Sequence, residues 1–339
     1  MKRKKILYII VFILLIGGVF TYKLYSDIYV SNVIKDGVLY VNNNDNKLSI
    51  LNKLYTNGFV KDTNSISWLM KKKKYSRIYT GKYNISKGMN NNDLVNNLRS
   101  GNQDAIKLTF NNIRTKEEFA GRLSGVLMID SLPLLNKLND QAFTAKFGFT
   151  TYTIIGMFLP NTYDIYWDIS INDLFKRMNK EYNVFWTPIR RQKAEKASIS
   201  PMGAIIIASI VEEESIKEDE ASTIAGVYIN RLNKNYALGA DPTLKFALGN
   251  FKIKRILNIH KEIDSPYNTY KYRGLPPGPI RQPSTITIDH VLNYQKHKYL
   301  YFCAKEDFSG YHNFAKTLIQ HNINAAKYRN ELNKRRIYK

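Results

Sequence analysis

Three consecutive glutamates, Glu212, Glu213 and Glu214, close a run of apolar residues that begins after Pro201. The run 202–211 is apolar on nearly every side, which predicts a helix buried within a domain. Successive helical side chains differ in direction by about 100°, so the three carboxylates cannot all face one cleft. A carboxyl held against apolar walls has a raised pKa and can keep its proton near neutral pH. Such a group can act as a general acid, whereas three carboxylates in water would be only a solvated helix end.

Motifs of other enzyme classes are missing from the sequence. It contains no GxSxG, Walker loop, GxGxxG or HExxH pattern. The five histidines show no compact metal-ligand spacing, so no metal site is predicted. The single cysteine, Cys303, excludes an internal disulfide framework and is expected to be a small buried side chain in a strand-like segment. Asp241 precedes Pro242, a pair that is typical of turns.

The first residues of the chain predict a membrane anchor. Basic residues at positions 2–5 precede the apolar run 6–22, whose 17 residues carry no charge. As a helix this run would span about 25 Å, the short end of what crosses a bilayer. The basic residues place the N-terminus inside, and no small-residue cleavage site follows the run. We expect a cytoplasmic tail (1–5), an uncleaved single-pass anchor, a connector (23–35) and a body outside the cytoplasmic membrane.

The charge balance bears on the partners of this body. Lys and Arg total 51 against 28 Asp and Glu, a formal net charge of +23. A chain this basic favours anionic surroundings such as nucleic acid, phospholipid or an anionic wall polymer. Because the anchor places the body outside the cytoplasm, nucleic acid is not an expected partner. Hydrophobic residues make up 44% and charged residues 23%, which argues against wholesale disorder and against a polytopic membrane protein.

The body is predicted to be α+β and to have three parts. Alternating apolar residues and Asn-rich turns in 36–110 indicate a small module of two similar strand–helix pieces. Residues 111–200 are largely helical in pattern, and the basic stretch 188–201 between two prolines is interpreted as a connector. Residues 201–339 hold the buried helix, a second helix, a proline-rich loop, a buried strand at 299–304 and a closing amphipathic helix.

Several segments of the chain stand in the order of a known set of motifs. Those of the last part are ASIVEEES (208–215), AGVYINRL (225–232), DPT (241–243), YNTY (267–270), GLPPGPI (274–280), YLYF (299–302), HNF (312–314) and HN (321–322). Those upstream are GKY (81–83), Met89, LRSG (98–101) and LPNTY (159–163). Together they resemble the YceG-like family of endolytic murein transglycosylases over nearly the whole chain. The departures are Asn161, which replaces an acidic residue, and Ser284, which stands where glycine is usual.

The resemblance implies a LysM-like module at 36–110, a helical linking part at 111–200 and a YceG-like catalytic core at 201–339. It implies a lytic transglycosylase, a carbon–oxygen lyase that acts on polysaccharides. Such an enzyme cuts the MurNAc–GlcNAc bond within peptidoglycan strands, leaves a 1,6-anhydro-MurNAc end and so limits or terminates strand elongation. It requires no metal or cofactor, and peptidoglycan synthases are a further expected partner.

The resemblance also implies the site residues. Two glutamates match acidic positions of the motif, and we expect Glu214 to be the acid because it directly precedes Ser215, with Glu212 as the second choice. Protonated Glu214 would donate to the leaving oxygen and, once ionised, accept the proton of the attacking muramyl C6 hydroxyl. The side chains expected to hold the sugars are Asn230, Asp241, Tyr267, Asn268 and Thr269.

Two other functions are compatible with these residues. A muramidase-type hydrolase would use Glu214 together with Asp241, and their carboxylates would then face one cleft within about 5–10 Å of each other. A non-catalytic wall-binding or scaffold protein would rely on the 36–110 module alone, and Glu214 would then have no need of a concave pocket.

Overall fold

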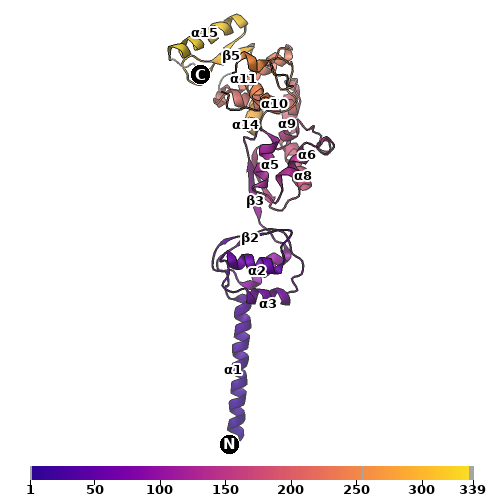
Figure 1. Ribbon diagram of the computed structural model, residues 1–339, viewed down its shortest axis with the longest axis vertical. Coiled ribbons are helices and arrows are strands. Elements are labelled where there is room, and N and C mark those ends of the chain that lie inside the picture. The colour runs from indigo at the N-terminus through magenta and orange to yellow at the C-terminus, as the bar shows by residue number, and fades with distance from the viewer. Residues whose placement is uncertain (1, 254–255, 336–339) are drawn as a thin grey trace. The chain divides into compact units, whose positions relative to one another are not determined.

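The computed structural model describes residues 2–253 and 256–335 and divides into two compact units (Figure 1). The first unit comprises Met1–Leu108, Val126–Met128 and Tyr163–Ile169, and the second comprises Thr109–Gly125, Ile129–Thr162 and Ser170–Lys339. Helices predominate, and the strands of the described ranges form separate two-stranded sheets. The mixed helix and sheet composition expected from the sequence is confirmed.

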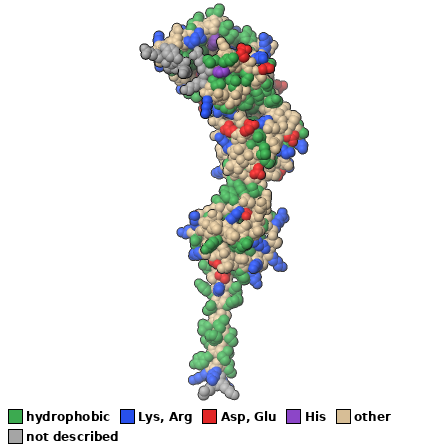
Figure 2. Space-filling view, viewed as in Figure 1, with side chains coloured by type: hydrophobic (Ala, Val, Ile, Leu, Met, Phe, Trp, Pro, Cys, Tyr) green, Lys and Arg blue, Asp and Glu red, His purple; other side chains and the backbone are tan. Residues whose placement is uncertain are grey.

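The first unit opens with the apolar helix α1 (Lys2–Tyr29). Its segment Arg3–Tyr29 is long and apolar enough to cross a membrane, and Figure 2 shows its uncovered hydrophobic side chains. The helix continues through Tyr29 into the segment expected to be a connector. Its last turns are held by Asn91, whose side-chain amide donates to the Asp27 carbonyl over 2.8 Å.

Two strands and two helices follow: β1 (Gly37–Val41), α2 (Lys47–Thr56), α3 (Asn64–Lys72) and β2 (Gly81–Ile85). β1 and β2 pair antiparallel with Leu39 opposite Tyr83. The inward side chains of both strands join apolar residues of the helices in one core. The alternating and helical patterns in this part of the sequence therefore predicted the elements correctly.

The region 36–110 ends with the second strand–helix piece and one further strand. Helix α4 (Asn91–Ser100) stops at Gly101, which has φ 68° and where a Cβ would lie 2.8 Å from the Tyr79 ring. The next strand, β3 (Ala105–Phe110), pairs with β4 (Asn161–Tyr166) and not with β1 or β2. The two strand–helix pieces and the strand after them were predicted, but the pairing of β3 was not, because its partner comes from a distant part of the sequence.

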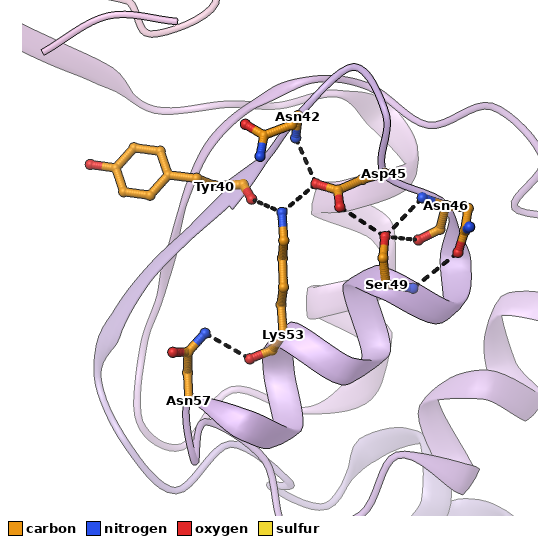
Figure 3. A network of polar contacts seen from close by, with 7 residues as sticks. All are labelled: Tyr40, Asn42, Asp45, Asn46, Ser49, Lys53 and Asn57. Carbon is orange, nitrogen blue, oxygen red and sulfur yellow. Dashed lines mark hydrogen bonds and ion pairs between the residues drawn. The ribbon is translucent and has the colours of Figure 1, made fainter. Parts of the chain in front are cut away.

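A cluster of polar side chains holds the turn between β1 and α2 (Figure 3). Asn46 caps α2 by accepting from the Ser49 amide (3.0 Å), and Ser49 Oγ accepts from the Asn46 amide (2.9 Å). The Asp45 carboxylate pairs with Lys53 and accepts from the Asn42 amide (2.7 Å) and the Ser49 hydroxyl (2.8 Å). Burial raises the pKa of Asp45, but Lys53 and these hydrogen bonds outweigh it and hold the pKa below its ordinary value.

The second unit is largely helical. Its elements before the central helix are α5 (Lys116–Ser124), α6 (Ser131–Leu138), α7 (Gln141–Ala145), the 3₁₀ turn η1 (Ile154–Met157), α8 (Ile171–Phe185) and α9 (Pro188–Lys196). Helix α9 lies where a connector was expected. Thr187 accepts from the Arg190 amide (3.3 Å) and Pro188 fills the first turn, so the proline starts a helix instead of interrupting one.

Helix α10 (Pro201–Glu214) is the buried helix that the sequence predicted. Ser200 caps its start by accepting from the Gly203 amide (2.9 Å), and every residue from Gly203 to Val211 is buried. It packs against α11 (Ala221–Asn233), α12 (Asp241–Ala247) and α14 (Thr285–Leu292). Figure 1 labels α11 and α14 beside it. The core of the second unit is therefore built around the helix whose last residue is Glu214.

The proline-rich loop is fastened to α10 from the side. Ser209, fully buried within α10, accepts from the Ile280 amide over 3.1 Å. A Cβ at Gly278 would lie 2.1 Å from the Tyr152 carbonyl oxygen, so this close approach requires glycine. These contacts fix the loop that continues into Arg281 and Ser284, two residues that bind the glutamates.

The chain ends with a two-stranded sheet and a helix. β5 (Tyr301–Ala304) pairs antiparallel with β6 (His312–Ala315), and α15 (Leu318–Lys334) packs on both. The strand and the closing helix were predicted, but the expectation that the strand and Cys303 are buried was wrong. β5 and its Cys303 are half-buried, because the strand lines a cavity and is not enclosed in the core.

We predict that Asp45→Asn loosens the first unit. Because the pKa of Asp45 is lowered on folding, its stabilising contribution is present above about pH 4 and lost as the pH falls through the folded pKa. Loss of the ion pair and charged hydrogen bonds should cost about 1–3 kcal/mol at pH 7. Hydrogen exchange of the α2 amides should accelerate about 10-fold or more at that pH. Unchanged protection of α2 would contradict the stabilising role of the cluster.

Candidate active site

Glu214 lies in the wall of a cavity of about 670 Å³. It is the last residue of α10, and its Oε1 accepts a hydrogen bond from the Tyr228 hydroxyl of α11 over 2.8 Å. Burial raises the pKa of the Glu214 carboxyl to about 7; the Tyr228 hydrogen bond lowers it, and the negative charge of Asp241 raises it. The carboxyl can therefore hold a proton near neutral pH, as a general acid must.

The cavity is assembled from distant segments of the second unit. Its walls come from the end of α10, from α11 and α12, from β5 and β6, and from α15 and the loops between them. The lining residues are Glu214, Tyr228, Arg231, Tyr236, Ala237, Gly239, Asp241, Lys261, Tyr270, Tyr301, Phe302, Cys303, Ala304, His312, Leu318 and His321. Aromatic faces beside hydroxyl and charged groups suit a ligand with both apolar and polar surfaces, as a sugar ring has.

Glu212 and Glu213 point elsewhere, as the helical geometry predicted. The two oxygens of Glu212 accept from the Arg281 guanidinium (3.1 Å) and the Ser284 amide (2.7 Å). Glu213 Oε1 accepts from Arg114 and from Arg281, both at 2.7 Å. These two carboxylates hold the proline-rich loop and α5's leading segment against α10, and Glu214 is left facing the cavity.

Asp241 also lines the cavity. It is the first residue of α12, and its Oδ1 accepts from the Tyr270 hydroxyl over 2.5 Å. The segment before it is tied to the same loop, since the Ala240 amide donates to Thr269 Oγ1 (3.0 Å) and the hydroxyls of Thr243 and Thr269 lie 2.8 Å apart. The DPT and YNTY segments therefore pack on each other.

The other residues expected to hold sugars shape the loops around the cavity. The Asn230 side-chain amide donates to the carbonyls of His297 (2.8 Å) and Tyr299 (3.0 Å). Asn268, which is fully buried, donates to two carbonyls of the loop before it. Tyr267 packs on Phe246 with ring centroids 4.6 Å apart. Among the described residues, Glu214 and Asp241 are the sequence-predicted site residues that the structure brings together in the cavity.

Sequence reasoning missed several cavity residues. Tyr228 and Arg231 stand in the AGVYINRL segment and Tyr270 closes the YNTY segment, so the motifs contained them. Arg231 donates from Nε to the Leu300 carbonyl over 2.6 Å and lies over the Tyr301 ring. The Tyr228–Glu214 contact joins two helices, and no spacing within either segment indicates it.

A carboxylate–histidine pair also went unpredicted. Glu220 is buried at the start of α11, and its two oxygens accept from the amide (3.0 Å) and Nδ1 (2.8 Å) of His312. His312 in turn lines the cavity. The two residues lie 92 positions apart, so only the tertiary structure brings them together.

These features define a single cavity with a protonatable glutamate at the end of a buried helix. The chain belongs to the YceG-like family, whose model matches residues 39–327. The sequence resemblance is thus confirmed by a match over most of the chain.

Named relatives and a solved structure agree with the family. The endolytic murein transglycosylase of Bacillus subtilis (strain 168) is 31% identical over 335 residues, which cover 93% of this chain and 91% of that protein. The endolytic murein transglycosylase of Streptococcus pneumoniae (strain ATCC BAA-255 / R6) is 30% identical over 281 residues. The match covers 73% of this chain and 50% of that protein. The crystal structure of a putative YceG-like protein from Listeria monocytogenes matches with a TM-score of 0.58 and 26% identity, over 85% of this chain and 98% of that one.

We predict that Glu214→Gln stabilises the protein at high pH. A pKa raised on folding means that the native state loses stability relative to low pH as the pH rises from 4.5 to about 7. The melting temperature of the variant relative to wild type should therefore rise over this range and level off above it. We expect a gain of about 2–4 °C or more at pH 8. The exposed Glu117→Gln serves as the control, and a pH-independent difference for Glu214→Gln would contradict the raised pKa.

Proposed function

We propose that the chain is an endolytic peptidoglycan lytic transglycosylase that cleaves the MurNAc–GlcNAc bond within glycan strands. The observation that carries this proposal is the Glu214 carboxyl, whose burial raises its pKa to about 7 in a cavity large enough for sugar rings. The family membership and the names of the relatives support the same reaction. A scaffold protein would have no use for a buried acid in such a cavity.

The mechanism needs one carboxyl in two protonation states. Protonated Glu214 donates to the glycosidic oxygen as the bond from C1 to that oxygen breaks. The ionised carboxylate, stabilised by the Tyr228 hydroxyl, then accepts the proton of the muramyl C6 hydroxyl as its oxygen bonds to C1. The products are a 1,6-anhydro-MurNAc end and a free GlcNAc hydroxyl, and Glu214 regains its proton.

A hydrolase is the second candidate, because Asp241 lines the same cavity as Glu214. In that reaction the second carboxylate would attack C1 or activate water, and the product would have a reducing end. The names of the relatives favour the lytic reaction, and the chemical nature of the new end distinguishes the two.

The remaining parts of the chain have proposed roles in placing this site at its substrate. The apolar helix α1 is proposed as a single-pass anchor in the cytoplasmic membrane, N-terminus inside, with the catalytic core (201–339) outside. The 36–110 region is proposed as a LysM-like module. In its sequence two helices, α2 and α3, connect the strands β1 and β2, which pair with each other. The 111–200 region is proposed to link the two, and peptidoglycan synthases stay a predicted partner.

Replacement of single glutamates tests which carboxyl is the acid. We predict that full-length Glu214→Gln loses at least about 1,000-fold of its activity on purified peptidoglycan, because an amide cannot donate a proton. Glu212→Gln should keep activity within about 10-fold, since its carboxylate holds a loop. Mass spectrometry of the fragments should show internal 1,6-anhydro ends with wild type. If Glu214→Gln stays active, another group must be the acid. Reducing ends among the products of wild type would favour the hydrolase.

Tyr228→Phe tests the hydrogen bond that lowers the pKa of Glu214. The rate constant kcat/KM should fall as the pH rises above about 7, because the acid becomes ionised. Without the phenol donor the ionised form is less stable, so this basic limb should move to higher pH by about 0.5–1 unit. The measurement is kcat/KM from pH 5 to 9 for both proteins. A shift to lower pH would contradict the assignment.

A further inference from the structure

The cavity contains two tyrosine–carboxylate pairs, and the reaction described above uses one of them. Tyr228 donates to Glu214 over 2.8 Å, and Tyr270 donates to Asp241 over 2.5 Å. The pairs are close enough to interact. The charge of Asp241 acts on the Glu214 carboxyl, and both carboxylates act on the Tyr270 hydroxyl. The second pair therefore lies beside the reacting centre without an assigned chemical task.

The geometry suits Asp241 to accept one further hydrogen bond. Its backbone is fixed at the start of α12, where the Ala240 amide and the Thr243 hydroxyl both bind Thr269. Tyr270 occupies Oδ1, and within the described ranges no protein group binds Oδ2. The free oxygen belongs to a residue of the cavity wall.

The chemistry of the sugar indicates which group would fill this place. The acetamido group at C2 of a muramyl residue can attack C1 through its carbonyl oxygen as the leaving group departs, a form of substrate-assisted catalysis. The amide nitrogen becomes positively charged and its N–H becomes a strong donor. A fixed carboxylate that accepts this N–H stabilises the charge as it develops.

We propose that Asp241, oriented by Tyr270, accepts the acetamido N–H of the muramyl residue under attack and stabilises the cyclic oxazolinium ion. This role rests on the proposed transglycosylase reaction. In the first step Glu214 gives its proton to the leaving oxygen, the bond from C1 to that oxygen breaks, and the acetamido oxygen bonds to C1. In the second step the C6 oxygen bonds to C1, its proton returns to Glu214, and the acetamido oxygen leaves. Asp241 neither gives nor takes a proton in either step.

The same contacts argue against Asp241 as a nucleophile. A phenol that donates to Oδ1 withdraws electron density from the carboxylate and weakens its attack on carbon. The hydrogen bond leaves Oδ2 able to accept from an amide. Asp241 is thus better suited to orient and stabilise the acetamido group than to form a covalent bond with C1.

The test compares full-length Asp241→Asn and Tyr270→Phe with wild type on purified peptidoglycan. Asp264→Asn is the matched control, since Asp264 accepts from the Tyr272 hydroxyl over 2.5 Å in a similar pair on an exposed loop. We expect kcat to fall about 100-fold or more for Asp241→Asn, with a smaller change in KM, because a transition-state charge loses its partner. The kcat of Tyr270→Phe should fall about 10-fold, and the kcat of the control should stay within about 2-fold of wild type.

Binding of the thiazoline of N-acetylmuramic acid supplies a readout apart from activity, since this stable ring mimics the oxazolinium ion. Wild type and Tyr270→Phe should bind it, and Asp241→Asn should bind it at least about 10-fold more weakly. Equal thiazoline binding by Asp241→Asn and wild type, with anhydro ends still formed, would overturn the role of Asp241 alone. Reducing ends from wild type would overturn the transglycosylase reaction and this role with it. Undiminished cleavage at de-N-acetylated muramyl residues would also overturn the role of Asp241.

Discussion

Burial of one carboxyl at the end of an apolar helix is the interaction on which the site depends. Glu214 closes a helix whose residues from Gly203 to Val211 are all buried, and desolvation of its half-buried side chain raises the pKa of its carboxyl. The carboxyl also lies at the negative end of the helix dipole, where an anion is unfavourable. The one protein group that binds it within the described chain is the neutral Tyr228 hydroxyl. Burial and the helix dipole both favour the protonated acid, and the Tyr228 hydrogen bond offsets them only in part.

Glu212 and Glu213, the two residues before Glu214, lie in environments that differ from that of Glu214. Arg281 pairs with Glu212 and Glu213, and Arg114 also pairs with Glu213. These cations neutralise two of the three adjacent carboxylates and fasten the proline-rich loop to α10. Among the described residues no cation forms an ion pair with Glu214, because the helical turn directs its side chain into the cavity. The loop contacts that keep Arg281 in place, through Ser209 and Gly278, are therefore part of what makes Glu214 the acid.

The sequence predicted the features that depend on local interactions and not those that depend on contacts between distant elements. Periodicity and capping residues predicted α10, α11 and the strands of the first unit, because those signals are local. The different directions of the three glutamates also followed from helix geometry. The partners of Glu214 and Asp241 come from other elements, as does the Glu220–His312 pair, and no local pattern encodes such contacts. Helix α9 was missed because the basic stretch between Pro188 and Pro201 was interpreted as a connector, whereas Pro188 follows the capping Thr187 and starts a helix.

Titration of the Glu214 carboxyl in the free, full-length protein would measure whether this group holds a proton near neutral pH. Carbon-13 NMR of glutamate side chains, with Glu214→Gln to assign the signal, would give its midpoint without any substrate. We predict a midpoint near pH 7, set by burial at the cavity wall. A midpoint near the ordinary value of 4.5 would mean that Glu214 is ionised at neutral pH and would contradict its role as the acid.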